Sequence, residues 1–399
     1  MTEKRNITKE DIFIKARMLS EGVRIKVKNQ PEKGSRNRPF VMDGCDLVVL
    51  LLPNPYSRLK VEIDGENVTV SDMGKVLRTG SLEVRRSWLD EKLSNGIPVK
   101  NIFSGSASII NLVMNFRCYN YDSGQGCKYC GLFAFPMTKT PSKSLAPKYT
   151  ELLVECAIIA IQSGWRGTMV LTGGALPPSQ RVNMSEGIEK IMTQLHESLD
   201  DEVLSQLHIA PNVYPPEDFE EMDNWKELGV NAVEFDLEVM DPAYFKAICP
   251  GKSKAHPFEY WKEAQETAVE IFGRGRGVFQ SMVSGIEPMS SLVEGVEERI
   301  SKGIYSAPLV FVPTPGSPYA QFRPPNAQWF VETNEKIVDI YFRYADTLDV
   351  NLLTDNRPGF TRVGLSYPLI LLRDEMARRL QEDGKFPPGL PSQDFIEDN

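Results

Sequence analysis

The stretch Arg117–Pro136, RCYNYDSGQGCKYCGLFAFP, contains three of the six cysteines of the chain, Cys118, Cys127 and Cys130. Eight residues separate the first two cysteines, and two residues separate the last pair. The glycines between and after them favour an open loop, because glycine accepts a positive φ and a close approach of the backbone. Three thiolates on one such loop can converge on a single inorganic centre. The sequence on either side indicates which kind of centre this is.

The composition is that of a globular protein. The chain has 399 residues, 41% hydrophobic and 25% charged, which allows more than one domain. Its net charge of −9 argues against general nucleic-acid or anionic-membrane binding. The start of the chain lacks the apolar core of a signal peptide, and the run Leu47–Pro53 is too short to span a bilayer. We therefore expect a cytoplasmic protein without membrane contact.

The cysteine usage fits a reducing compartment, in which clustered cysteines serve metal binding or catalysis. The three isolated cysteines, Cys45, Cys156 and Cys249, are expected to be small buried hydrophobic residues.

Residues 1–105 differ in pattern from the remainder and predict an α+β accessory module. A helix is expected from Glu10 to Ser20, and strands are expected at Leu59–Ile63 and Asn67–Val70. Asp64-Gly65 between these two strands is a strong hairpin signal. A lid, a docking surface and a scaffold are all open roles for this module, and the scaffold is the simplest.

Between residues 106 and 355 predicted strands alternate with predicted helices, which is typical of a parallel sheet. The first strand, Ala107–Met114, precedes the cysteine loop, and the helix Lys148–Ser163 follows it. Six further strands are expected at Gly167–Leu171, Leu207–Ala210, Asn231–Leu237, Val278–Ser284, Ala307–Val312 and Leu348–Leu353. Seven strands predict a full or partial (β/α) barrel of the TIM type, closed by a C-terminal extension at residues 356–399.

Polar residues gather mostly at the carboxyl ends of these predicted strands, where β/α barrels carry their active sites. Gly173 and Gly174 follow the second strand. Glu234, Asp236 and Glu238 alternate along the fourth strand, so their side chains are expected on one face. Further polar residues near the strand ends are Asn212, Arg276, Gln280, Asn356, Arg357 and Arg362.

In this setting the cysteine loop resembles that of the radical S-adenosylmethionine (SAM) superfamily, and within it the biotin synthase, methylornithine synthase and hydrogenase-maturase group. That group has the motif C-x3-C-x2-C with an aromatic residue before the last cysteine. Tyr129 occupies the aromatic position here, and the C-x2-C half matches. The first spacing departs from the family pattern, since eight residues replace three.

Four later segments resemble the same group in the same order. Leu171–Pro178, LTGGALPP, stands where the family has a Gly-Gly-Glu segment, with Ala175 in place of the glutamate. Phe235–Glu238 resembles the acidic segment of the fourth strand, and Pro313–Gly316 resembles a Pro-x-Pro-Gly loop. Gly285, Ile286 and Glu287 resemble the segment that lines adenine. The resemblance covers residues 106 to about 320.

The resemblance implies a [4Fe–4S] cluster bound by Cys118, Cys127 and Cys130, which are then also the catalytic residues. An electron donor such as flavodoxin or ferredoxin would reduce it, and SAM cleavage would give a radical that abstracts hydrogen from a small metabolite or cofactor precursor. Rearrangement, C–C bond change and methylene chemistry are the expected outcomes. The residues expected to bind cofactor are Tyr129, Gly173, Gly174, Ala175, Glu234, Asp236, Glu238, Arg276, Gly285, Ile286 and Glu287. Those expected to bind substrate are Asn212, Gln280, Asn356, Arg357 and Arg362.

Two other readings remain open at this point. The cluster could act on a peptide or an RNA, with the basic stretch Lys26–Arg38 docking the macromolecule. Alternatively, the cysteines could bind structural zinc in a protein without catalytic activity. A zinc site usually needs four Cys or His ligands, commonly as paired C-x2-C motifs, and no second pair exists in this sequence.

Overall fold

The computed structural model describes residues 6–29, 38–45, 47–84, 86–102, 104–105, 109–115, 117–131, 147–275, 277–345, 347–348 and 364–373. The α-helices are α1 (Lys9–Glu21), α2 (Tyr119–Asp122), α3 (Pro147–Gln162), α4 (Val182–Ser198), α5 (Asp201–Ser205), α6 (Glu221–Glu227), α7 (Pro242–Ile248), α8 (Pro250–Ala255), α9 (Phe258–Phe272), α10 (Met289–Ser301) and α11 (Ala327–Arg343). The strands are β1 (Arg24–Asn29), β2 (Phe40–Met42), β3 (Val48–Val49), β4 (Leu59–Asp64), β5 (Asn67–Asp72), β6 (Lys75–Leu82), β7 (Ser104–Gly105), β8 (Ile109–Asn115), β9 (Thr168–Gly173), β10 (His208–Asn212), β11 (Val233–Glu234), β12 (Val278–Ser284) and β13 (Tyr305–Val310).

The N-terminal sheet has six strands in the order β1-β4-β5-β6-β2-β3. Only β1 and β4 are parallel, and the other neighbours are antiparallel. The predicted hairpin is confirmed, because Asp64 pairs with Asn67 and Gly65 takes a φ of 59° in the turn. Alternate residues of β4 are buried, as expected for a strand with one face on the core.

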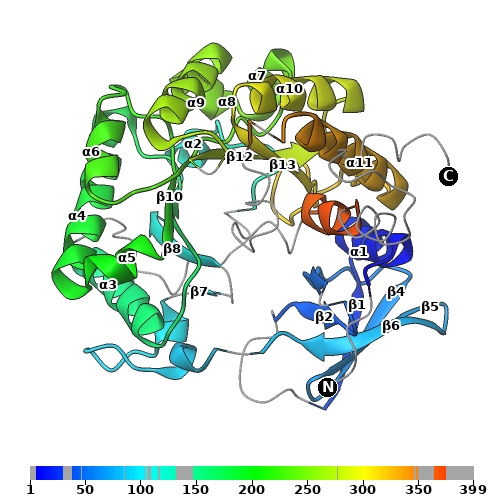
Figure 1. Cartoon of the computed structure of the whole chain (residues 1–399). Helices are drawn as coiled ribbons and strands as arrows, with labels where there is room; N and C mark the ends of the chain where they lie inside the picture. The colour runs from blue at the N-terminus through cyan, green and yellow to red at the C-terminus, as the bar shows by residue number, and fades with distance from the viewer. Residues whose placement is uncertain are drawn as a thin grey trace, which may run out of the picture.

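Helix α1 contacts both this sheet and helix α11, which lies far from it in the sequence. At its start, Thr8 N donates to Asp11 Oδ2 at 2.9 Å and Asp11 N donates to Thr8 Oγ1 at 3.2 Å, which forms a capping box. Arg78 Nε of β6 donates to Asp11 Oδ1 at 2.6 Å and so ties the helix to the sheet. α1 also packs against α11, and the two lie side by side in Figure 1.

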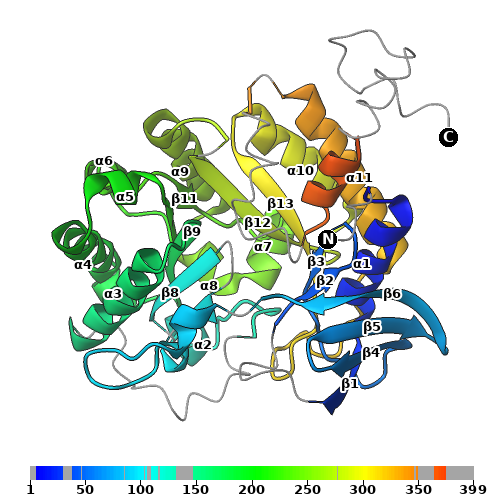
Figure 2. The same ribbon diagram turned by 60° about the horizontal axis from the view of Figure 1, so that its bottom comes forward.

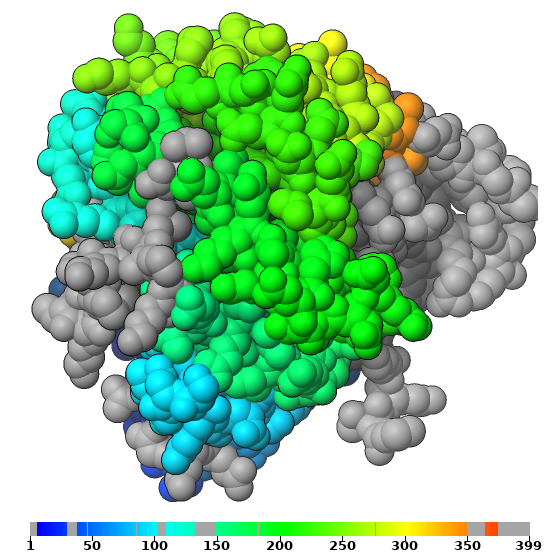
Figure 3. Space-filling model, turned by 90° about the vertical axis from the view of Figure 1, so that its left-hand side faces the viewer, coloured from blue at the N-terminus to red at the C-terminus, as the bar shows by residue number. Residues whose placement is uncertain are grey.

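The second sheet has seven strands in the order β13-β12-β11-β10-β9-β8-β7. The strands from β8 to β13 are parallel to their neighbours, and β7 is antiparallel to β8. The first four residues of β9, Thr168–Leu171, are all buried, as is typical of a parallel strand covered on both faces. Figures 1 and 2 show the long helices on the outer side of this sheet, and Figure 3 shows the face that residues 147–227 cover.

The predicted α/β fold with a parallel sheet is confirmed. The sheet is open among the described residues, since no pairing joins β13 to β7, and a closed barrel is not shown. Most of the last predicted strand, Leu348–Leu353, lies outside the described residues. The division into three segments at 105 and 355 stays a prediction. No helix in the described part of the chain is long and apolar enough to cross a bilayer.

One strand is shorter than predicted. β11 covers Val233–Glu234, whereas the pattern predicted Asn231–Leu237. The Asp236 side chain accepts the hydrogen bond from Ser281 N of β12 at 2.6 Å, so a backbone carbonyl does not take it. The two strands then meet only once more, at the bridge between Glu238 and Met282, where Glu238 has a φ of 71°.

Candidate functional site

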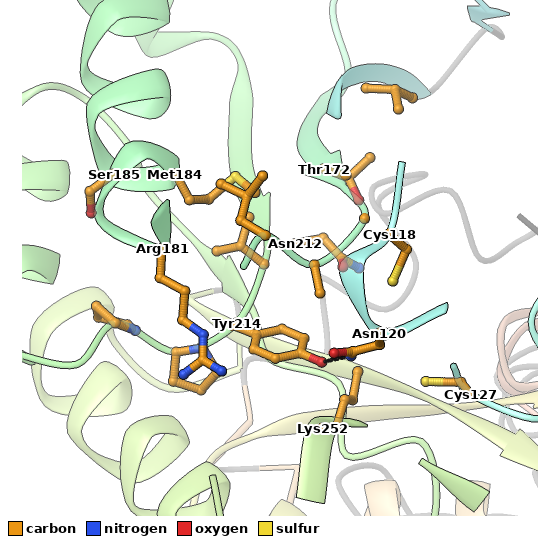
Figure 4. A pocket seen from close by; sticks show the side chains of 18 of the residues that line it. Cys118, Asn120, Cys127, Thr172, Arg181, Met184, Ser185, Asn212, Tyr214 and Lys252 are labelled. Atoms are coloured by element: carbon orange, nitrogen blue, oxygen red, sulfur yellow. Dashed lines mark hydrogen bonds between the residues drawn. The ribbon is translucent and has the colours of Figure 1, made fainter. Parts of the chain in front are cut away.

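A cavity of about 530 Å³ lies at the carboxyl ends of β8, β9 and β10, a size that suits a small molecule. Residues from six places in the chain line it, and Figure 4 shows several of their side chains pointing into it. Nine of the residues singled out in the sequence are among them: Cys118, Cys127, Tyr129, Cys130, Gly173, Gly174, Ala175, Asn212 and Glu238.

The loop after β9 holds the start of the cysteine loop. Gly174 N donates to Asn115 O at 2.7 Å, and Tyr119 N donates to Ala175 O at 2.8 Å. A Cβ at Gly174 would lie 2.5 Å from Arg117 O. Glycine is therefore needed here because two backbones meet, a reason that is independent of any ligand.

The segment between α7 and α8 holds the other end of the loop. Lys128 N donates to Ile248 O at 2.9 Å, and Gly251 N donates to Gln125 O at 2.9 Å. A side chain on Gly251 would collide with the amide of Asn120. The cysteine loop is therefore clamped between the end of β9 and the segment that follows β11.

The eight residues between the first two cysteines are an ordered part of the site. They include the short helix α2, which begins directly after Cys118. Asn120 Nδ2 donates to Tyr214 Oη at 2.5 Å across the cavity, and Tyr121 Oη donates to the carbonyl of Cys130 at 2.9 Å. The unusual spacing thus adds a helical turn whose side chains bind the cavity wall and the end of the loop.

The three thiols differ in their surroundings. Burial raises the pKa of Cys118. A hydrogen bond with the thiol of Cys249 lowers the pKa of Cys127, against the effect of burial. Cys249 is fully buried, as predicted, and the structure adds that it lies beside a cysteine of the loop.

The donor set fits an iron–sulfur cluster in its chemistry, since three thiols line one cavity and iron–sulfur clusters are held by thiolates. Within the described residues, however, no three His, Cys, Asp or Glu side chains are grouped closely enough to hold a metal ion.

A buried ion pair forms the floor of the cavity next to the cysteines. Lys252 Nζ of α8 donates to Glu238 Oε1 at 2.5 Å and to Asp236 O at 2.8 Å, and both charged side chains are 12% exposed. The ammonium group also lies 4.8 Å from the centre of the Trp261 ring. Burial opposes the charge of Lys252, but Glu238 and Cys127 outweigh it and raise its pKa well above the ordinary value.

The other two acids of the predicted strand are buried beneath Glu238. Asp236 accepts from Asn212 Nδ2 at 3.1 Å, and burial raises its pKa to about 6. Burial and the proximity of Asp236 raise the pKa of Glu234 well above its ordinary value. That the three side chains share one strand face stays a prediction, and of the three acids Glu238 lines the cavity.

Besides Glu234 and Asp236, four further predicted residues lie away from the cavity lining. The side-chain amide of the buried Gln280 is bonded inside the fold, with its Oε1 accepting from Gln265 Nε2 at 2.9 Å and its Nε2 donating to Ser306 Oγ at 2.9 Å. Glu287 accepts from the backbone of Met240 at 2.7 Å and holds the turn before α7. Gly285 and Ile286 also do not line the cavity. Arg276, Asn356, Arg357 and Arg362 lie outside the described residues.

Among the cavity residues that the sequence did not single out are Arg181 and Lys252. Lys252 directly follows Cys249, Pro250 and Gly251 and belongs to none of the motifs quoted above. Its pairing with Glu238 depends on a helix turning back over the strand end, which no local pattern predicts.

Comparison with known proteins identifies a relative along nearly the whole chain. The chain is 46% identical over 392 residues to the bacteriochlorophyllide c C-7(1)-hydroxylase of Chlorobaculum limnaeum, an alignment that covers 96% of this chain and 98% of that protein. No protein-family model matches the chain.

Proposed function

The chain belongs to the family of bacteriochlorophyllide c C-7(1)-hydroxylase, and on this basis we propose that it is a radical SAM enzyme that hydroxylates a bacteriochlorophyllide. Such a substrate is a small molecule and a cofactor precursor, as the sequence predicted. The name of the relative favours hydroxylation over the predicted rearrangement, C–C bond change or methylene chemistry. The resemblance to the biotin synthase group stays a prediction.

The observation that carries the radical SAM assignment is the convergence of separate segments on one cavity. Cys118, Cys127 and Cys130 line the same space as Gly173–Ala175 and Glu238, which lie after different strands. Three thiolates supply soft ligands for a [4Fe–4S] cluster and leave one iron open for SAM. The peptide, RNA and zinc alternatives gain no support from this cavity or from the relative.

The residues of the chain take distinct roles in this proposal. The three cysteines hold the cluster, and the carboxylate of Glu238 binds the ammonium group of SAM by a charge-assisted hydrogen bond. Lys252 holds that carboxylate in place. The apolar wall of the cavity, which includes Val113 and Met184, keeps water and stray hydrogen donors from the reacting atoms.

The bound cluster and SAM would supply a 5′-deoxyadenosyl radical that removes a hydrogen atom from the substrate carbon. The net conversion is balanced when SAM, the substrate C–H bond and water give the alcohol, methionine, 5′-deoxyadenosine and a proton. One electron enters from the donor, and one returns when the substrate radical is oxidised and takes hydroxide from water.

The test uses the full-length protein, prepared without oxygen and reconstituted with iron and sulfide. We expect a brown protein with about four irons, an electron paramagnetic resonance signal on reduction, and release of 5′-deoxyadenosine from SAM. With bacteriochlorophyllide c and isotopically labelled water, the product should gain one labelled oxygen. Each single Cys→Ala change at 118, 127 or 130 should abolish the signal and the product.

Cys45→Ala is the matched control, because Cys45 lies in the N-terminal module outside the cavity. It should keep the iron content and the activity. A colourless protein that binds one zinc, or cleavage of SAM without any change in bacteriochlorophyllide, would overturn the proposal in its metal or its substrate respectively.

A further inference from the structure

Arg181 lies in the cavity wall on the side away from the cysteines. It immediately precedes α4, and its side chain is 21% exposed. In Figure 4 the guanidinium group extends past the ring of Tyr214, with Cys118 and Cys127 on the other side of that ring. The cavity therefore has a thiol end and a cationic end, separated by an aromatic side chain.

The guanidinium group of Arg181 is only partly used by the protein. Its Nη1 donates to Glu217 Oε1 at 3.0 Å. Its Nε is buried and has no hydrogen-bond partner within the described part of the chain. A buried donor without a partner is unfavourable by roughly 1–3 kcal/mol, so a ligand that draws the guanidinium group into the cavity and accepts from this donor gains affinity. The edge of a guanidinium group matches a carboxylate, which accepts two parallel hydrogen bonds.

The ion pair between Arg181 and Glu217 is weak enough for a ligand to compete for the guanidinium group. Glu217 is 68% exposed, so water screens its ion pair with Arg181. Glu217 also lies 3.9 Å from His256 Nε2, and burial lowers the pKa of that histidine. Arg181 is therefore the cation that a ligand meets at this end of the cavity.

The remaining lining between the two ends is largely apolar. Val113, Leu176, Met184, Val213, Pro215 and Trp225 contribute to it. A ligand that fills this space is expected to be mostly apolar and to carry an anionic group at one end. A chlorophyllide acid has this character, since its macrocycle is apolar and its side chain ends in a carboxylate.

We infer that Arg181 binds the carboxylate of the substrate and so orients the macrocycle with its reacting edge toward the cysteines. This inference rests on the proposed function. SAM also has a carboxylate, but the proposal places that group on the open iron at the thiol end. Arg181 is therefore a residue that determines which substrates bind and in which direction.

The test measures binding of bacteriochlorophyllide c and of its carboxyl methyl ester to the reconstituted protein without reductant, by fluorescence quenching. Arg181→Gln should weaken binding of the acid roughly ten- to hundredfold and leave binding of the ester within about twofold. Glu217→Gln should tighten binding of the acid, because it frees the guanidinium group. Lys190→Gln is the matched control, since it removes a positive charge from the same helix outside the cavity, and it should change neither affinity.

Equal weakening of acid and ester by Arg181→Gln would overturn the inference, as would a weakened affinity for SAM with unchanged binding of the acid. Glu217→Gln keeps the inference testable if Arg181→Gln fails to fold, since unchanged affinity for the acid would also contradict it. The two proposals fail separately. A protein that binds the acid through Arg181 but makes no hydroxylated product contradicts only the reaction, and a product formed equally well from acid and ester contradicts only the role of Arg181.

Discussion

Two lysines, one near each sheet, are shielded from water, yet their pKa values shift in opposite directions. Lys15 of α1 is fully buried in the N-terminal module, and burial lowers its pKa to about 7. Lys252 of α8 lies in the cavity lining with its side chain 12% exposed, and its pKa is raised well above the ordinary value. Lys252 donates to Glu238 and to a backbone carbonyl, and the anionic groups near it favour its charged form.

This contrast separates a structural region from a functional one. In the module the charged form of Lys15 is unfavourable in the folded state, because an ammonium group loses its hydration when it is buried. At the cavity Lys252 is instead paired with Glu238. Removing such a pair from water costs free energy, so the pair by itself adds little to the stability of the fold. An ion pair kept charged beside three thiols therefore indicates a role in binding a charged ligand.

The largest expected effect is at the cavity. Lys252→Met leaves the Glu238 carboxylate buried without its partner, and we expect a loss of roughly 3–5 kcal/mol in the free energy of unfolding. Urea denaturation monitored by circular dichroism measures it. Lys254→Met is the matched control on the same helix, because Lys254 is exposed. The double variant Lys252→Met with Glu238→Gln should recover part of the loss, and an additive loss would contradict the pairing.

The second effect is a pH dependence in the module. Between pH 7 and 10 the folded state holds Lys15 mostly neutral while the unfolded chain keeps it protonated, so the unfolded state binds more protons and stability rises with pH. The rise that depends on Lys15 should be about 3 kcal/mol. Its measure is the difference between the wild type and Lys15→Met in urea titrations across this range. Parallel pH profiles for the two proteins would show that Lys15 keeps its ordinary pKa when folded.

The smallest effect tests whether the regions can be perturbed separately. Thr8→Ala removes the capping box of α1 and should destabilise the protein by about 1 kcal/mol, measured by thermal unfolding. Since Thr8 is in the module and not in the cavity lining, iron content and SAM cleavage at room temperature should stay at the level of the wild type. A loss of iron together with the cap would show that the module supports the cysteine loop directly.

Much of the fold could be predicted from periodicity. The bounds of β12 match the prediction, and the predicted helices Glu10–Ser20 and Lys148–Ser163 are present as α1 and α3 with small shifts at their ends. β11 was predicted too long, because the competition between the Asp236 side chain and the backbone for Ser281 N is a tertiary contact. The pattern could not predict whether the sheet closes into a barrel, because closure depends on whether the first and last strands pair after folding.

The site was predictable where chemistry is local and not where it depends on folding. The cysteines, Gly173, Gly174 and Glu238 could be identified because a motif or a strand end marks each of them. Gln280 has the same kind of position, yet it is bonded to Gln265 and Ser306 inside the fold. Arg181 and Lys252 carry no motif, and only the placement of their helices brings them to the cavity.

The sequence alone determined the strand and helix alternation, the hairpin at Asp64-Gly65 and the presence of three cysteines on one loop, because these depend on spacing and on the conformational preferences of single residues. The tertiary structure alone decided that the eight-residue gap forms a helical turn bonded to Tyr214, and that Lys252 pairs with Glu238. It also left Arg181 with a free donor at the other end of the cavity. These features arise from segments that meet only after folding, when burial makes each unpaired polar group unfavourable and selects the partner that satisfies it.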